Sequence, residues 1–425
     1  MLINLRSICA RIVVCVLTFT GVATPSAAQT AVELARQGFA AKERKQYQLA
    51  IQLFDEALKR GKVSTEQRGL IVYGRGVSFE ALRMLDFALA DLDAAIALLP
   101  NFSNSYVYRA LIWVDRRELD RARDDLQQAI RIEPDSALTH NNLGSVYERK
   151  GELDAAIQSY DTAIRLDPSY AQAFYNRGHA YTSKRNYRAA IADYDSAIGL
   201  QEKFADAYSN RGGLYLFMGE TERAVRDFDE AIRLKENDPI YWTNRANAYL
   251  AMNRFADAIA DFDRAQKIDP GSAAIYMGRG RARLYSDEVT AAIDDLKVAV
   301  RLRPTNANPA IWLHIARVHQ GQPDLEELGQ NSARVDQNQW PAPVLGVYLG
   351  HIDVKKLHEY AERGDVDDLS KRRCEADFYV GEYLNHSRAG IAAGRQILQR
   401  VVERCTPGDV MFIAARAELN ATIKN

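Results

Sequence analysis

The sequence predicts an all-α protein in which about eight helical hairpins stack into an α-solenoid, a superhelix of repeated helix pairs. Three observations support this fold class. Residues between Ala31 and about Pro304 repeat with a period of 34, each repeat contains two amphipathic helical patterns around a short polar turn, and proline recurs near the end of the second pattern. One such hairpin cannot bury its apolar faces alone, whereas stacked neighbours can.

The first 28 residues have the pattern of a signal peptide and stand apart from the repeats. Arg6 and Arg11 precede an apolar run at 12–23, and the small residues that follow predict cleavage after Ala28. About 12 apolar residues are too few to span a bilayer, and the two cysteines of this segment lie too early for a lipid anchor. We therefore expect an exported, periplasmic and soluble mature chain. The net charge of the full 425-residue chain, -1, does not favour nucleic acid or acidic membranes as partners.

Small, aromatic and proline residues keep their register through residues 29–304. In the reference repeat, Gly144 occupies position 8, Ala156 position 20, Tyr160 position 24 and Pro168 position 32. Equivalent residues recur at intervals of 34, and the first repeat is offset by four additional residues. This pattern resembles the tetratricopeptide repeat, and the resemblance covers eight repeats. It implies a right-handed superhelix whose first helices line a concave, partner-binding surface.

An arginine recurs at position 7 and an aspartate at position 23, on the two helices of one hairpin. Both are absent together from the repeat that has Leu143 and Ser159. The hairpin turns near position 15, so the two residues should face each other, and a buried arginine can satisfy a carboxylate where either charge alone would be costly. An alternative is that the arginine reaches the next repeat's aspartate. The predicted structural pairs are Arg75–Asp91, Arg109–Asp125, Arg177–Asp193, Arg211–Asp227, Arg245–Asp261 and Arg279–Asp295.

Position 6, beside the arginine, predicts contacts to a ligand. It holds asparagine in four consecutive repeats, namely Asn142, Asn176, Asn210 and Asn244. Because neighbouring helix residues point about 100° apart, the resemblance places these amides on the concave surface. An amide donates and accepts, so a ladder of four could pair with the backbone of an extended peptide. Tyr175, His179, Phe217 and Asn247 are predicted to line the same surface. The alternative is that asparagine is ordinary scaffold sequence in such repeats.

Residues 305–425 lose the 34-residue register but keep the pattern of helical hairpins. Cys374 opens the first helix of the last hairpin and Cys405 closes the second, about equally far from the turn. They are the only cysteines after the predicted signal peptide, so we predict a Cys374–Cys405 disulfide in an oxidising compartment. The stretch after Pro407 predicts a final capping helix.

The order of "IWLHIA", "QWPAPVLGVYLG" and "FYVGEYL" in this region resembles the C-terminal part of the NlpI lipoprotein family. The resemblance implies an envelope adaptor that brings murein hydrolases to a periplasmic protease, and it adds a homodimer as an option. This chain lacks a lipidation cysteine and has a longer repeat array, so its partners need not be the same. We expect protein or peptide partners and no nucleic acid.

The sequence contains no pattern of an enzyme site. It has no P-loop, no dinucleotide-binding glycine motif and no nucleophile elbow. His314 and His319 share a predicted helix, but their spacing of five does not place them on one face, and no acidic third ligand accompanies them. We therefore expect no catalytic residue, cofactor or metal. Two alternatives to the adaptor remain: a scaffold of an envelope secretion or polysaccharide-export assembly, and an enzyme whose site lies in the C-terminal region.

Overall fold

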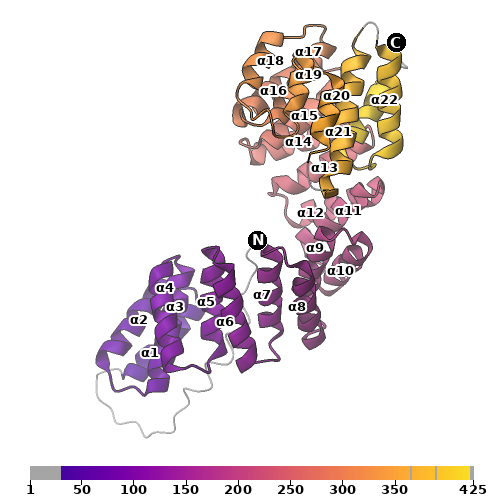
Figure 1. Ribbon diagram of the computed structural model, residues 1–425. Helices are drawn as coiled ribbons and strands as arrows, with labels where there is room; N and C mark the ends of the chain where they lie inside the picture. Colours follow the sequence, from indigo (N-terminus) through magenta and orange to yellow (C-terminus); the bar gives the residue numbers. More distant parts are fainter. Residues whose placement is uncertain (1–29, 364–365, 388–389, 422–425) are drawn as a thin grey trace. The chain divides into compact units, whose positions relative to one another are not determined.

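The computed structural model describes residues 30–421, except 364–365 and 388–389. Over these residues the chain forms 23 helices and no strand (Figure 1). The predicted all-helical array of stacked helix pairs is therefore confirmed. None of the described helices combines the length and hydropathy that crossing a bilayer requires. The predicted signal peptide lies outside the described residues.

Contacts divide the chain into two compact units, residues 1–193 and 194–425, and the boundary between them in the sequence falls within α10 (Tyr187–Leu200). This division follows contacts, whereas the predicted boundary at 304–305 marks where the 34-residue register ends. The first unit contains α1 (Ala31–Glu43), α2 (Tyr47–Arg60), α3 (Thr65–Ala81), α4 (Leu85–Leu98), α5 (Ser103–Asp115), α6 (Leu119–Ile132), α7 (Ala137–Arg149), α8 (Leu153–Leu166) and α9 (Ala171–Ser183).

The second unit continues the hairpins and ends in a less regular region. Its repeat helices are α11 (Ala205–Phe217), α12 (Thr221–Leu234), α13 (Pro239–Ala251), α14 (Phe255–Ile268), α15 (Ala273–Tyr285), α16 (Val289–Leu302) and α17 (Ala307–His319). The later helices are α18 (Leu325–Ser332), α19 (Pro343–Tyr348), α20 (Val354–Ala361), α21 (Val366–Asn385), α22 (Ile391–Arg404) and α23 (Val410–Ala421). The Cys374–Cys405 disulfide joins the middle of α21 to the residue that follows α22, with the two Cα atoms 5.9 Å apart. The expectation that Cys374 opens its helix was wrong, because α21 already begins at Val366.

Small residues let the two helices of each repeat approach closely. A Cβ added to Gly144 would lie 2.5 Å from the Tyr160 ring, so only glycine permits this contact without a shift. On the second helix, Ala156, Tyr160 and Ala163 are completely buried. The repeated glycine, alanine and aromatic residues are thus the residues that pack the two helices of the hairpin together.

The first helices of successive hairpins also contact one another. These contacts join α7 to α9 in the first unit, and α11 to α13, α13 to α15 and α15 to α17 in the second. We call the surface that these odd-numbered helices, α1 to α17, share within each unit the first-helix layer.

Candidate functional site

The arginine of each predicted pair lies between two hairpins and binds two carboxylates. Arg177 Nε and Nη2 donate to Asp193 Oδ2 and Oδ1 at 2.8 and 2.6 Å, across the two helices of one hairpin. The same two-bond geometry occurs in the other five predicted pairs, at Arg75, Arg109, Arg211, Arg245 and Arg279. The structure therefore contains all six predicted ion pairs.

The second carboxylate comes from the preceding repeat, which the sequence analysis missed. Arg177 Nη1 donates to Asp161 Oδ1 at 2.5 Å. Equivalent bonds join Asp55, Asp93, Asp195, Asp229 and Asp263, all at position 25, to the arginine of the next repeat. The alternative, in which the arginine bonds to an aspartate of the next repeat, is therefore wrong, because the additional aspartate belongs to the preceding repeat.

A signal for this second partner was present in the sequence. Position 25 is Gln127 before Leu143 and Lys297 before Leu313, the two places where the following repeat lacks the arginine. The acidic residue at position 25 and the arginine at position 7 thus occur together or not at all. Each arginine holds its own hairpin together and ties it to its predecessor.

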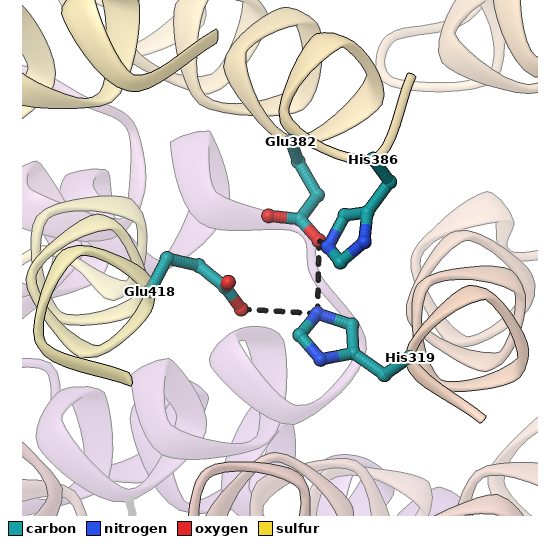
Figure 2. A group of neighbouring side chains, drawn as sticks. All are labelled: His319, Glu382, His386 and Glu418. Carbon is teal, nitrogen blue, oxygen red and sulfur yellow. Dashed lines mark hydrogen bonds and ion pairs between the residues drawn. The ribbon is translucent and has the colours of Figure 1, made fainter. Parts of the chain in front are cut away.

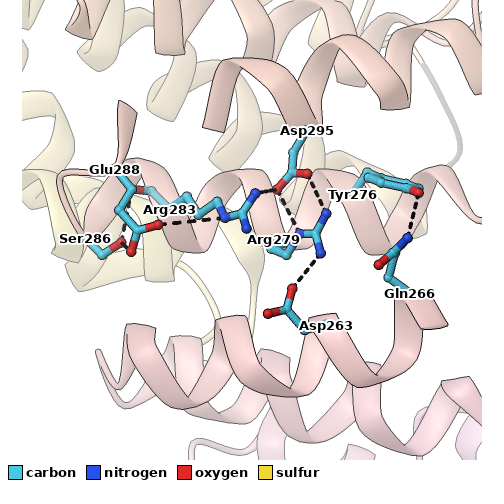
Figure 3. Close-up of polar contacts among 8 residues, drawn as sticks. All are labelled: Asp263, Gln266, Tyr276, Arg279, Arg283, Ser286, Glu288 and Asp295. Atoms are coloured by element: carbon cyan, nitrogen blue, oxygen red, sulfur yellow. Dashed lines mark hydrogen bonds and ion pairs between the residues drawn. The ribbon is translucent and has the colours of Figure 1, made fainter. Parts of the chain in front are cut away.

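We call each arginine with its two aspartates a clasp. Burial makes these clasps structural rather than reactive. Burial raises the pKa of Asp193, and the hydrogen bonds and charge of Arg177 offset only part of that effect. The hydrogen bonds from Asp193 raise the pKa of Arg177, although burial opposes this. Figure 3 shows the equivalent Arg279 between Asp263 and Asp295, with Arg283 donating a further hydrogen bond to Asp295 at 2.8 Å. No part of this arrangement presents an unpaired charge to a substrate.

Two of the four predicted groove asparagines bond to the preceding first helix. Asn176 Nδ2 donates to Asn141 Oδ1 at 2.9 Å, and its own oxygen accepts from Gln172. Asn244 makes the equivalent bond to Ser209, 3.2 Å. Asn142 and Asn176 are each only 6% exposed, and the side-chain nitrogen of Asn142 is buried without a hydrogen-bond partner among the described residues. This arrangement differs from the open ladder that we expected.

The other predicted groove residues differ in their exposure. In the first unit, Tyr175 is buried, whereas His179 is exposed and contacts Glu148. The hydrogen bond to Glu148 raises the pKa of His179, and burial opposes it. In the second unit, Phe217 is 40% exposed and Asn247 is partly buried. His179 and Phe217 are thus accessible to a partner.

In the second unit, the chain's own C-terminal segment, residues 407–419, packs on the last residues of the first helices. Gly408 packs on the backbone of α11, where an added Cβ would lie 2.7 Å from Phe217 Cα. Further along, Phe412 and Ile413 join the apolar cluster of α13 and its neighbours, and Arg416 donates to Ala251 O. Glu418 Oε1 finally lies 3.2 Å from His319 Nε2 on α17.

These contacts follow one register through the repeats. Phe217, Ala251 and His319 all occupy position 13, the last residue of a first helix, and Tyr285 occupies it on α15. Tyr285 is partly buried, and its helix α15 contacts α23 directly. The predicted capping helix therefore lies across four successive repeats as a bound helical peptide would.

Comparisons with known proteins agree with the repeat assignment. A model described as "TPR repeat" matches residues 111–151 and 149–184, and models described as "Tetratricopeptide repeat" match 171–204, 205–238 and 239–272. No curated protein sequence matches the chain significantly.

Similar solved structures include three that span about half of this chain. A tetratricopeptide repeat protein from Parabacteroides merdae is 24% identical over 59% of this chain and 99% of its own, with a TM-score of 0.47. PilF of Pseudomonas aeruginosa is 21% identical over 49% of this chain and 94% of its own, with a TM-score of 0.45. YrrB, described as "a TPR protein with an unusual peptide-binding site", is 23% identical over 43% and 95%, with a TM-score of 0.38.

The matched residues form one continuous block from 111 to 272, and the same hairpin geometry extends on both sides of it. The chain is therefore a tetratricopeptide repeat protein.

Proposed function

We propose that this protein is a non-catalytic adaptor that binds proteins or peptides on its first-helix layer. The observation that carries the proposal is the C-terminal segment, which occupies this layer in the second unit. A surface that holds twelve residues of its own chain, Pro407–Glu418, through apolar contacts and backbone acceptors has the chemistry of a peptide-binding surface. Tetratricopeptide repeats in general bind proteins or peptides, and no enzyme family matches this chain.

The first unit offers the layer on which we place the partner. Among its described residues, His179 is exposed on α9. Helix α7 ends in two charged residues, Glu148 at position 12 and Arg149 at position 13. The equivalent positions of the second unit carry Leu216, Phe217, Leu250 and Ala251, which hold the C-terminal segment. Because these positions are charged in α7 and apolar in α11 and α13, we expect a more polar partner on the first unit.

The export pattern of the first 28 residues and the Cys374–Cys405 disulfide support a periplasmic location. Within that compartment, the resemblance of the tail to the NlpI family favours murein hydrolases and a protease as partners. The scaffold of a secretion or polysaccharide-export assembly is the second candidate. The same layer would serve either role, and the identity of the bound proteins decides between them.

Site-specific photo-crosslinking in the native envelope tests the proposal. A photoreactive residue at His179 should capture a partner, whereas the same residue at exposed Arg165 on the second helix α8 should not. Hydrolases and a protease among the captured proteins support the first role, and export subunits support the second. Equal capture at both positions would contradict binding on the first-helix layer. Capture that persists when Asn142, Asn176, Asn210 and Asn244 are all alanine would exclude an asparagine ladder.

A further inference from the structure

Four side chains from three segments of the second unit converge at the end of the C-terminal segment. His319 is the last residue of α17, Glu382 lies in α21, His386 follows α21, and Glu418 lies in α23 (Figure 2). One nitrogen or oxygen of each lies within 4.8 Å of those of the other three. From this convergence we propose that the four residues bind a divalent transition-metal ion such as Zn²⁺.

The spacing of the donor atoms is close to that of a coordination shell. His319 Nε2 lies 3.0 Å from Glu382 Oε1 and 3.2 Å from Glu418 Oε1, and His386 Nε2 lies 3.0 Å from Glu382 Oε1. Zinc bonds of about 2.0–2.1 Å in a tetrahedron separate the ligand atoms by about 3.3 Å. These three distances therefore need to open by only a few tenths of an ångström, and the wider pairs, at most 4.8 Å apart, need to close.

A buried carboxylate oxygen gives an independent reason to expect a cation here. Glu382 is only 2% exposed, and its Oε2 has no hydrogen-bond partner among the described residues. An anionic oxygen removed from water costs several kcal/mol unless a partner stabilises it. A cation held between Glu382 and Glu418 would stabilise this buried carboxylate.

The burial of two carboxylates also favours a cation. Glu382 is 2% exposed and Glu418 is 3% exposed, and His319 Nε2 lies between an oxygen of each. Two carboxylates removed from water at this separation are stabilised by positive charge between them, which a divalent ion would supply.

The donor set selects the class of metal and the role of the site. Two imidazoles with two carboxylates suit Zn²⁺ and its neighbours in the first transition row rather than Ca²⁺ or Mg²⁺, which prefer oxygen donors alone. Four protein donors leave no position open for a substrate, as in structural zinc sites. The ion would therefore fasten α23 to α17 and α21 and hold the C-terminal segment on the first-helix layer.

These residues could not be recognised from the sequence, where His319 shares a helix with His314 and His386 lies in the tail at irregular spacing from other histidines. The ligands are 63, 4 and 32 positions apart in order along the chain, and no short motif joins them. Only the last hairpin and α23, folded back against α17, bring them together.

Metal titration of the full mature chain, stripped with a chelator, tests the proposal. Zn²⁺ should bind by calorimetry at one equivalent per chain, and Co²⁺ should give the absorption of a four-coordinate N/O site. His319→Gln and His386→Gln should each weaken Zn²⁺ binding by more than about tenfold. Replacing a residue that only hydrogen-bonds to a metal ligand already lowers metal affinity by about 10- to 100-fold. The matched control is His358→Gln, because His358 also pairs with a carboxylate, Asp377, at 3.0 Å but lies outside the cluster. This variant should bind Zn²⁺ as the parent chain does.

A second readout separates binding at the cluster from binding elsewhere. Zn²⁺ should slow hydrogen exchange of the α23 amides in the parent chain and in His358→Gln, but not in His386→Gln. His386 is exposed, so its replacement should leave the fold intact, which far-UV circular dichroism of the metal-free variant checks. No binding of Zn²⁺ or Co²⁺ by the parent chain, or binding that survives both His319→Gln and His386→Gln, would overturn the proposal.

Discussion

The clasp of Arg177 gives a stability prediction whose control is built into the sequence. Asp193 is 5% exposed and accepts two hydrogen bonds from Arg177, so Arg177→Leu leaves a buried carboxylate with no countercharge. Breaking one side of a buried pair costs about 3–5 kcal/mol. The additional tie to Asp161, whose side chain is 51% exposed, contributes about 0–1 kcal/mol because solvent screens it.

The double variant Arg177→Leu with Asp193→Ser reproduces what the preceding repeat already contains, Leu143 and Ser159. Ser159 Oγ donates to Ala155 O at 2.8 Å, so a serine at this position has a local acceptor. We expect the double variant to lose about 1–2 kcal/mol, less than Arg177→Leu alone, because no buried charge remains.

A double-mutant cycle measures this difference. Urea denaturation followed by far-UV circular dichroism gives the free energy of unfolding, and hydrogen exchange in α9 reports the local effect, since repeat arrays need not unfold in one step. Equal losses in Arg177→Leu and in the double variant, within about 0.5 kcal/mol, would refute the coupling of the two charges.

Three further predictions concern the second unit. Ile413→Asp, which places a charge at an 8% exposed position of α23, should release the C-terminal segment, raise binding of a hydrophobic dye and speed hydrogen exchange in α23; unchanged exchange would contradict the bound-segment interpretation. Cys374→Ala with Cys405→Ala should lower the free energy of unfolding by about 3–4 kcal/mol, as expected for the loop that this bond closes. A reductant should then have the same effect on the parent chain and none on the variant. Burial lowers the pKa of His314 from 6.5 to about 4. Between these values the unfolded chain binds a proton that the folded chain does not, so stability should fall by about 3 kcal/mol as pH falls from 6.5 to 4. In urea titrations, a slope that persists unchanged in His314→Phe would assign this loss to other groups.

The sequence predicted the contacts that repeat and one contact that occurs once, the Cys374–Cys405 disulfide, but not the contacts of the C-terminal segment. The clasp of Arg177 and Asp193 follows from two helices of fixed geometry, and a residue type that recurs six times shows its role by its spacing. The asparagines show the limit of that reasoning. Position 6 was expected to face a ligand, but Asn176 is buried because the neighbouring first helix lies close enough to bond its amide.

Contacts between distant segments had no counterpart in the sequence pattern. The path of residues 407–419 along position 13 depends on how the last hairpin turns the chain back, and no periodicity encodes that turn. The cluster of His319, Glu382, His386 and Glu418 arises from the same return of the chain. Nonlocal packing, rather than any unusual residue, is therefore what the sequence analysis could not supply.

The return of the C-terminal segment has a consequence for how the second unit unfolds. In a simple repeat array each repeat contacts only its neighbours, so repeats at an end can unfold one at a time. Gly408, Ile413 and Glu418 instead contact α11, the cluster of α13 and α17, so one segment joins repeats that are not adjacent. The second unit should therefore unfold more cooperatively than the first.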